Sequence, residues 1–361
     1  MIKIAVFFGG KISKHLVLVR EAARKMKVEL DLVSYNNVCF ETEENKVKIR
    51  SNIKTHLSRK GGTSSLEKGG FEMKDASDYD VLFFRTTGKH WEEVDLIINS
   101  INPPALRAPS LDKEGKTRPI VVDPLVRFGK PSHACKAWQM LKLKEANIEV
   151  PKSVYGSLWY LYETMKSIEN SRQQNFAPCE SGNQAQRPQN LLTLNSQFNF
   201  PIIIKGSGGD RGTRVFKANN LQELEKLVRD LRKSETEEGR RYMLQEYIEN
   251  DGDFRVLVLG EKVLGVMKRA RTAKNEFRNN YSAGGTVEVA DLPKEVKELA
   301  VKAAKVCGLS VAGVDVAFRN YDLKKPVIWE VNKGPQFKGF MKATGIDVPA
   351  EIVKYLVSLK K

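Results

Sequence analysis

Short apolar runs alternate with amphipathic segments over the first third of the chain. Residues 2–8 and 28–35 are apolar enough for buried strands, and residues 14–26 between them carry apolar side chains at helical spacing. The same strand–helix–strand order returns once more, at residues 80–85, 90–101 and 119–123. This alternation predicts a parallel sheet with crossover helices, and its end near Val126 is a candidate domain boundary.

Two polar segments interrupt the pattern. Residues 41–78 contain RKGGTSS and EKGG and show little periodicity, which predicts a flexible polar segment or a long hairpin. Residues 169–199 are rich in Asn, Gln, Ser and Pro. Because such a composition cannot bury enough apolar surface to order the chain, we expect a disordered insertion there, away from any catalytic chemistry.

From residue 200 onward, strand pairs alternate with single helices. The expected strands are 200–205, 213–218, 243–248, 254–260, 261–269, 311–319 and 326–332. The expected helices are 221–233, 294–308 and 348–359, and an earlier helix, 133–147, follows Pro131. The pattern predicts an α/β N-terminal domain (1–128) followed by two α+β subdomains (129–247 and 248–361).

A lysine and a glycine-rich loop form the first candidate site. The apolar strand 200–205 ends at Lys205, and four glycines follow directly, at Gly206, Gly208, Gly209 and Gly212. Glycines let backbone N–H groups converge on phosphate oxygens. The Gly-Lys-Ser/Thr ending of a P-loop is missing and a strand follows, so a hairpin folding over phosphates fits better. An ordinary flexible hairpin is the alternative.

Two neighbouring strands carry the second candidate site. Glu330 and Asn332 are two residues apart and therefore point to one face of their strand. Asp315 lies in the preceding apolar strand, which we expect to pair with the next through a turn at 320–325. Two carboxylates and an amide are the hard oxygen donors that suit Mg²⁺ (or Mn²⁺). The alternative is that these acids face solvent or pair with nearby Lys and Arg.

Two further segments carry weaker signals. Gln245, Glu246, Tyr247, Asp253 and Arg255 surround a link between strands where an adenine could bind, and a structural strand pair explains them equally well. The segment that leaves the strand 261–269 is rich in donors that could hold a phosphoryl group and a carboxylate: Lys268, Arg269, Arg271, Arg278, Asn279 and Asn280. A solvated basic loop is the alternative there.

Composition and charge narrow the function classes. The net charge of +16 favours anionic partners, but the Lys and Arg are spread along the chain without interleaved aromatics, which argues against nucleic acid. The four cysteines and four histidines show no metal-ligand spacing. No apolar run reaches the roughly 18–20 residues of a membrane span, and no signal-peptide cleavage site is present. We therefore expect a cytoplasmic protein without membrane partners, and the sequence leaves a homo-oligomer open.

Taken in order, these segments resemble the ATP-grasp superfamily, and specifically the RimK-type α-L-glutamate ligases. The residues that carry the resemblance are PIIIKGSGGDRG, LQEYIENDGDFRVLVLG, KRA…EFRNN…GG, VAGVDV and EVNKGPQFKGFMKATGIDV. The resemblance covers roughly Pro131 to the C-terminus, apart from the insertion 169–199, whereas the N-terminal part is similar only in its strand–helix layout. It implies an ATP-grasp fold in which a lid subdomain (129–247) and a metal-bearing subdomain (248–361) grip ATP between them.

The resemblance also implies roles for the candidate residues. Lys205, Arg269 and Arg278 would be the catalytic cations near the transferring phosphate. The nucleotide would be bound by Lys136, Lys205, Gly208, Gly209, Gly212, Glu246, Tyr247, Asp253, Arg278, Asn279 and Asn280, with Glu246, Tyr247 and Asp253 at the adenine and ribose edge. Asp315, Glu330 and Asn332 would be the magnesium ligands.

The implied activity is that of an enzyme, an ATP-dependent carboxylate–amine ligase. It forms an amide bond through an acylphosphate and releases ADP and phosphate; the amine acceptor is a small molecule, a carrier protein or a protein tail. Ala283 and Lys333-Gly334 depart from the family pattern where the substrates would bind, so the resemblance extends to ATP and metal but not to glutamate. An ATP-binding regulatory or scaffold protein with little turnover is one alternative. A basic nucleic-acid-binding protein is the other.

Overall fold

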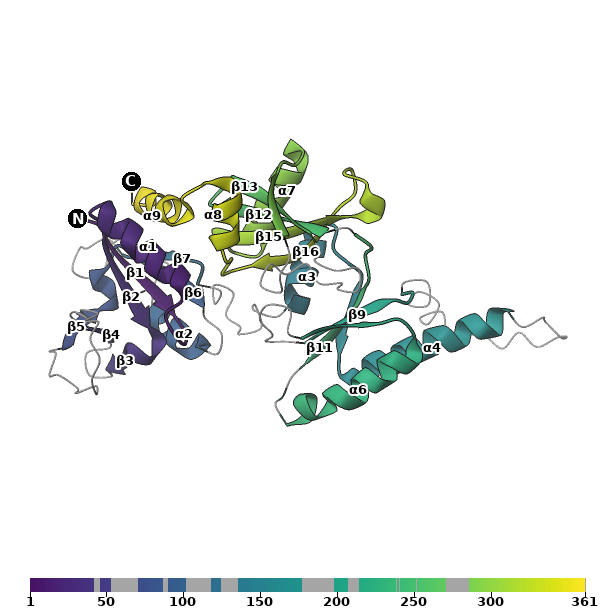
Figure 1. Cartoon of the computed structure of the whole chain (residues 1–361). Coiled ribbons are helices and arrows are strands. Elements are labelled where there is room, and N and C mark those ends of the chain that lie inside the picture. The colour runs from purple at the N-terminus through teal and green to yellow at the C-terminus, as the bar shows by residue number, and fades with distance from the viewer. Residues whose placement is uncertain are drawn as a thin grey trace, which may run out of the picture.

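The computed structural model describes residues 1–41, 46–52, 71–86, 90–101, 118–124, 136–176, 198–206, 214–237, 239, 241–250, 252–270 and 286–360. One parallel and three antiparallel sheets organise these residues. Three of the sheets follow one another along the molecule. The N-terminal sheet lies at one end, a five-stranded sheet lies in the middle, and a four-stranded sheet lies at the other end (Figure 1).

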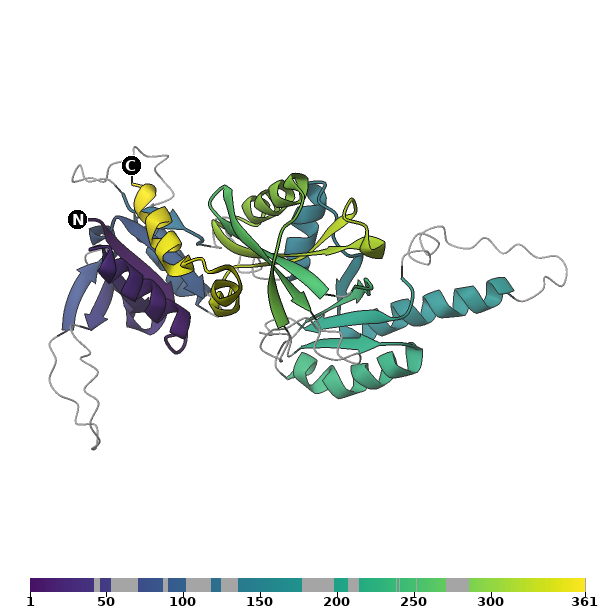
Figure 2. The ribbon, with the colours of Figure 1, turned by 45° about the horizontal axis from the view of Figure 1, so that its top comes forward.

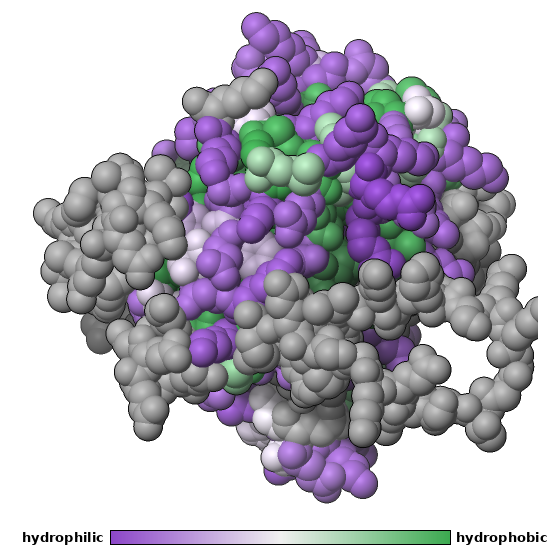
Figure 3. Space-filling view, turned by 90° about the vertical axis from the view of Figure 1, so that its left-hand side faces the viewer, coloured by the Kyte–Doolittle hydropathy of each residue, from purple (hydrophilic) through white to green (hydrophobic). Residues whose placement is uncertain are grey.

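The N-terminal sheet is parallel, as the strand–helix alternation predicts. Its strand order is β2-β1-β6-β7, with β1 (Lys3–Phe8), β2 (Glu29–Ser34), β6 (Val81–Thr86) and β7 (Ile120–Val122). Helices α1 (Lys14–Lys25) and α2 (Trp91–Ile101) pack on opposite faces of the sheet. Both faces of β1 are therefore covered, which explains its unbroken run of buried residues. The outer surface at this end is largely hydrophilic, with smaller hydrophobic areas between (Figure 3).

A three-stranded antiparallel sheet occupies part of the polar segment 41–78. It pairs β4 (Lys46–Asn52) with β3 (Val38–Glu41) and β5 (Phe71–Asp75), beside the short turns η1 (Tyr35–Asn37) and η2 (Ala76–Asp78). Val47 and Ile49 are fully buried in the core that also contains α2 residues, which anchors the strands. The segment therefore includes a long hairpin, whose residues 53–70 lie outside the described part of the chain.

The four-stranded antiparallel sheet has the order β10-β9-β11-β8, with β8 (Ser153–Gly156), β9 (Ile202–Gly206), β10 (Val215–Ala218) and β11 (Tyr242–Glu246). Helices α4 (Leu158–Phe176) and α6 (Leu221–Thr236) lie side by side on it (Figures 1 and 2). Helix α4 continues through residues 169–176, which the composition assigned to the insertion. Leu161, Met165 and Ile168 form the buried face of the helix before this segment, and within it Arg172 donates to Glu169 and to the carbonyl oxygen of Phe198. Residues 177–197 are not among the described ones.

The five-stranded antiparallel sheet has the order β14-β13-β12-β15-β16, with β12 (Gly252–Leu259), β13 (Lys262–Ala270), β14 (Thr286–Ala290), β15 (Val311–Phe318) and β16 (Pro326–Asn332). Helices α3 (Lys136–Glu145) and α7 (Lys294–Val306) share one core with it. Helix α3 therefore packs with the C-terminal sheet, although it precedes the four-stranded sheet in the sequence and the predicted subdomain 129–247 included it.

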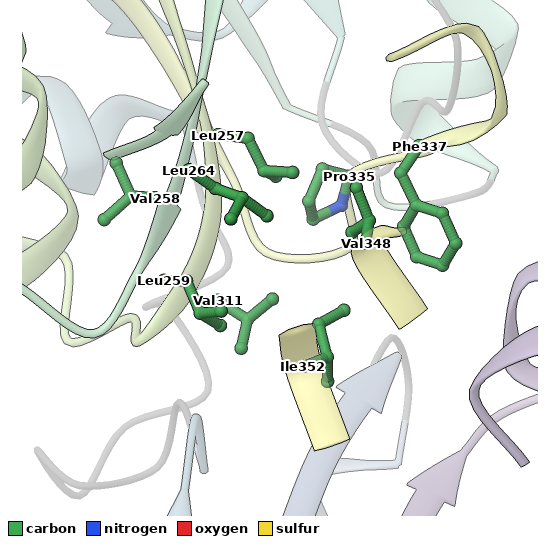
Figure 4. A pocket seen from close by; sticks show the side chains of 9 residues that line it. All are labelled: Leu257, Val258, Leu259, Leu264, Val311, Pro335, Phe337, Val348 and Ile352. Atoms are coloured by element: carbon green, nitrogen blue, oxygen red, sulfur yellow. The ribbon is translucent and has the colours of Figure 1, made fainter. Parts of the chain in front are cut away.

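The C-terminal helices connect the five-stranded sheet to the N-terminal one. After β16, whose link to β15 contains the turn η5 (Arg319–Tyr321), come α8 (Lys338–Thr344) and α9 (Val348–Ser358). Helix α9 lies beside α1 (Figures 1 and 2), and Ile352 belongs to the same core as Ile4 and Val311. The pocket at this junction is lined by apolar residues alone, which suits packing rather than a charged ligand (Figure 4). Among the described helices, none has both the length and the apolar character to cross a membrane.

Asp123, directly after β7, forms a second link between these sheets. Its carboxylate accepts hydrogen bonds from the backbone N–H groups of Ser310 at 2.5 Å and Val311 at 3.1 Å, at the start of β15. Asp123 is only 2% exposed, and burial raises its pKa to about 6 although both hydrogen bonds favour the charged form. Its φ of 51° is a conformation that Asp adopts more readily than most residues.

We expect Asp123→Ala to lower the free energy of unfolding by about 2–4 kcal/mol, because a buried and a partly buried N–H group lose their acceptor. Asp123→Asn should lose less, since it keeps an oxygen acceptor and tolerates the positive φ. Urea unfolding measures both changes. The control is Asp322→Ala, which removes an acceptor from the exposed N–H group of Lys324. Equal stability of the Asp123→Ala and Asp322→Ala proteins would show that Asp123 is not a structural link.

Candidate active site

The oxygen donors predicted on the last two strands lie together. Asp315 of β15 is directly opposite Glu330 of β16, and Gly313 is opposite Asn332. The Asn332 side-chain amide donates to a carboxylate oxygen of Asp315 at 3.1 Å. Asp315 is 5% exposed. The strand pairing therefore brings two carboxylates and one amide into a single group at the sheet surface.

Two arginines from neighbouring strands hold Asp315. Arg255 of β12 donates through Nε and Nη2 to the two oxygens of Asp315, each at 2.7 Å. Arg269 of β13 lies 3.0 Å from Asp315 through Nη2. Burial alone would raise the pKa of Asp315, but the two guanidinium groups outweigh it and bring that pKa to about 2. Asp315 is thus held ionised in the interior.

Asp253 completes the buried network. Both of its oxygens accept from Arg269, at 2.6 Å from Nε and 2.5 Å from Nη2, and the side chain is almost fully buried. Burial is the largest influence on Asp253 and raises its pKa, while Arg269 opposes the shift. Asp253 is directly opposite Arg269 in the pairing of β12 with β13, and Arg269 also contacts Asp315, so the three side chains share one face of the sheet. Asp253 and Arg269, both sequence candidates, are therefore direct partners.

Two lysines approach the carboxylates from other elements. Lys136, at the start of α3, donates to Glu330 at 2.8 Å, and this contact lowers the pKa of Glu330 although burial opposes the shift. Lys205 of β9 is opposite Met243 of β11, so the two side chains share a face, and Met243 belongs to the core of the five-stranded sheet. Burial first, and then nearby Lys136, lower the pKa of Lys205 to about 8.

Glu246 and Tyr247 lie where β11 leaves the four-stranded sheet. Glu246 accepts from the backbone N–H of Lys152 at 2.8 Å and from Arg319 Nη2 at 2.5 Å, which connects this sheet to the end of β15. The ammonium group of Lys217 lies 4.1 Å from the centre of the Tyr247 ring. These contacts place both residues at the link between the two sheets.

Six of the predicted site residues fall outside the described residues: Gly208, Gly209, Gly212, Arg278, Asn279 and Asn280. Their roles stay predictions. Arg255, in contrast, is a site residue that the sequence reasoning named only as a flank of a strand. Its spacing of two from Asp253 places both on one face of β12, and that alternation is the signal that could have identified it.

The donor set fits a magnesium-type cation better than a transition metal. In the described residues, no group of three or more His, Cys, Asp or Glu side chains is arranged to hold a metal ion. Asp315, Glu330 and Asn332 instead offer only hard oxygens, two of them on carboxylates and one on an amide. Mg²⁺ usually takes few protein ligands and completes its shell with water and phosphate oxygens. The side chains present are compatible with that chemistry.

Comparison with solved structures gives the class of the fold. The ATP-grasp ligase PsnB, complexed with a phosphomimetic variant of its minimal precursor, Mg and ADP, has a TM-score of 0.59 at 17% identity, covering 100% of this chain and 99% of that one. The macrocyclase MdnC bound with its precursor peptide MdnA from Microcystis aeruginosa MRC has a TM-score of 0.56 at 11% identity, over 99% and 100% of the two chains. The fold is that of the ATP-grasp ligases.

Sequence comparison gives the family. The model of the RimK-like ATP-grasp domain matches residues 167–356, which is more than half of the chain, and the chain belongs to this family. A probable alpha-L-glutamate ligase of Chromohalobacter salexigens is 37% identical over 158 residues, 43% of this chain and 50% of the relative. The chain spans about half the length of the curated relatives that it matches.

The buried network predicts a large effect on stability. Asp253→Asn removes the charge that faces Arg269, and we expect the free energy of unfolding to fall by about 3–5 kcal/mol without nucleotide. Urea unfolding provides the measurement. Glu225→Gln, which breaks the exposed pair of Glu225 with Arg229 on α6, is the control and should change stability by less than about 1 kcal/mol. If Asp253→Asn lowers the free energy of unfolding no more than the control does, the pair of Asp253 and Arg269 does not stabilise the fold.

Proposed function

We propose that this protein is an ATP-dependent carboxylate–amine ligase that forms an amide bond through an acylphosphate. The observation that carries the proposal is the group formed by Asp315, Glu330 and Asn332. Lys136 of α3 contacts Glu330, and Lys205 of the four-stranded sheet interacts electrostatically with the carboxylates of the group. Oxygen donors for a metal and lysines for a polyphosphate are what phosphoryl transfer from ATP requires. Membership of an ATP-grasp family supports the same assignment.

In the proposed reaction, a substrate carboxylate oxygen bonds to the γ-phosphorus of ATP, and the bond to the bridging β–γ oxygen breaks to release ADP. An amine then attacks the acyl carbon, phosphate leaves, and the amine loses a proton to give a neutral amide. Mg²⁺ or Mn²⁺, held by Asp315, Glu330 and Asn332, would neutralise phosphate charge and polarise the phosphoryl oxygens.

The chain's own residues would position the nucleotide. Lys205 and Lys136 would bind phosphate oxygens, and the glycines of the loop 206–212 would let the backbone approach them. Glu246 and Tyr247 would contribute the adenine and ribose edge, and Asp253 would hold Arg269 nearby. Arg269 and Arg278, with Asn279 and Asn280, would stabilise negative charge at the transferring phosphoryl group.

The substrates are proposed by class. Relatives named as probable alpha-L-glutamate ligases and fold relatives complexed with precursor peptides support an amino acid or a peptide as one of the two substrates. The acceptor is then an amino acid, a carrier protein or a peptide tail. Lys333, next to Asn332, is a large basic residue and would alter which substrate fits.

Turnover tests the proposal directly. We expect ADP release in the presence of at least one member of a panel of amino acids and peptides, with an amide product identified by mass spectrometry. Glu330→Ala and Lys205→Ala should each lower kcat by at least about 100-fold, because each removes a group that stabilises the transferring charge. The exposed control Arg229→Gln should leave the rate unchanged. Absence of turnover with intact nucleotide binding would instead favour a regulatory ATP-binding protein.

The metal site can be tested without turnover. ADP with Mg²⁺ should raise the melting temperature of the protein more than ADP alone, because the ion binds only the folded site. Glu330→Gln should abolish the increment that Mg²⁺ adds and keep the shift produced by ADP, and EDTA should do the same to the wild type. A variant that responds to Mg²⁺ like the wild type would exclude Glu330 as a metal ligand.

A further inference from the structure

A second group of buried charges lies where the N-terminal sheet meets the end of β16. It consists of Arg85 in β6, Asp123 after β7 and Lys333 after β16. Strands β6 and β7 are parallel neighbours, so Arg85 and Asp123 lie at the same carboxyl edge of the sheet. In open α/β sheets this edge is where ligands bind.

Arg85 is buried without a carboxylate partner in the part of the chain that the structure describes. It is 7% exposed, and its one hydrogen bond there runs from Nη1 to the Lys333 carbonyl oxygen at 3.4 Å. Its guanidinium also lies over the Phe83 ring, with Cζ 5.6 Å from the ring centre. A guanidinium has five N–H donors, and a buried charge is costly unless it is paired and hydrogen-bonded.

Asp123 does not supply the missing partner. Its two oxygens accept from the backbone of Ser310 and Val311, and among the described contacts it forms no ion pair with Arg85. Asp123 therefore contributes charge at longer range and fixes the sheet. Among the described residues of this group, two basic side chains, Arg85 and Lys333, stand against one acidic side chain, Asp123.

The described residues leave room beside the guanidinium. Among them, a Cβ atom placed on Gly334 would have one neighbouring heavy atom within 4 Å, Nη2 of Arg85 at 4.0 Å. Gly334 is exposed, whereas Arg85 is buried. The space next to Gly334 thus opens onto the side of Arg85 that carries Nη2, and a small anion entering there would meet the guanidinium fork. Carboxylates match that fork through two parallel hydrogen bonds.

Arg85 and Lys333 lie next to the proposed site of phosphoryl transfer but contact none of the three proposed metal ligands among the described hydrogen bonds and ion pairs. Arg85 contacts the carbonyl of Lys333, one residue beyond Asn332, whereas Lys136 contacts Glu330 and the arginines of the sheet contact Asp315. A substrate reacting at the metal ligands could therefore reach Arg85 with a second, non-reacting end. An amino acid whose amine attacks the acylphosphate carries such a group, because its own carboxylate takes no part in the reaction.

We infer that Arg85, assisted by Lys333, binds a non-reacting carboxylate of the amine-donating substrate and thereby determines acceptor specificity. This inference rests on the proposed ligase function for the identity of the substrate. Arg85 is then a specificity-determining residue, and its substitution should not change nucleotide or metal binding.

The test is a binding measurement on protein saturated with Mg²⁺ and ADP. Calorimetry compares each member of a panel of L-amino acids, including acidic ones, with its α-carboxamide and, for the acidic ones, its side-chain amide. We expect at least one acid to bind wild type about 10- to 100-fold more tightly than one of its amides. In Arg85→Gln, the affinity for that acid should fall to the affinity for the amide, while the affinity for the amide stays the same.

Two further variants and one assay keep the outcome decisive. Arg85→Lys should recover part of the preference, since it keeps the charge but not the fork. Arg229→Gln, an exposed arginine on α6, should keep all of it. In turnover assays, Arg85→Gln should raise KM for the acceptor and leave KM for ATP unchanged. Unchanged melting temperature and ADP affinity establish that the variant is folded.

Three binding results, and one turnover result, would overturn the inference. The first is that no acid in the panel binds wild type more tightly than its amides. The second is that Arg85→Gln keeps the preference. The third is that the variant loses affinity for ADP or Mg-ATP, which would assign Arg85 to the nucleotide. Carboxylate-dependent binding without turnover would refute the ligase function but not the carboxylate site at Arg85. Turnover with an unchanged acceptor KM in Arg85→Gln would refute the carboxylate site but not the ligase function.

Discussion

The ionised state of Asp315 inside the protein is the constraint on which the rest of the site depends. A carboxylate removed from water is stable only if cations and hydrogen bonds compensate its desolvation. Arg255, Arg269 and Asn332 provide both, from three strands of one sheet. The strand order that places β12 between β13 and β15 is thus stabilised by these charged contacts as well as by the apolar core of the sheet.

This network has a consequence for what the site can accept. Its three carboxylates, on Asp253, Asp315 and Glu330, face Arg255, Arg269 and Lys136. Lys205 adds one further positive charge, so the described charges nearly balance before any ligand binds. A polyphosphate alone would add negative charge beside Glu330. A cation that enters with it restores the balance, which gives a physical reason for a nucleotide and a divalent ion to bind together.

Much of the fold, and the convergence of Asp315, Glu330 and Asn332, could be predicted because both depend on local patterns. Strand alternation, together with the expected pairing of two consecutive strands, brings these three residues to one face. The pairings with Arg255 and of Arg269 with Asp253 depend on which strands become neighbours, which no local pattern specifies. Composition also gave the wrong state for residues 169–176, which continue α4, because it does not show contacts such as that of Arg172 with the carbonyl oxygen of Phe198, 26 residues further along the chain. The sequence did not indicate a role for Arg85 for a related reason, because its hydrogen-bond partner, Lys333, lies far along the chain.

The site draws its parts from two packed bodies, and the contacts between these bodies determine its geometry. The proposed metal ligands belong to strands that pack with α3 and α7, whereas Lys205 lies on a strand whose other face packs with α4 and α6. Met243, opposite Lys205, belongs to the first core, and Glu246 bonds to Arg319 at the end of β15. The separation of Lys205 from Glu330 is therefore governed by Met243 and Glu246 rather than by either core alone. If Lys205 binds a phosphate as proposed, substitutions at these two positions would change that binding although neither residue contacts the phosphate.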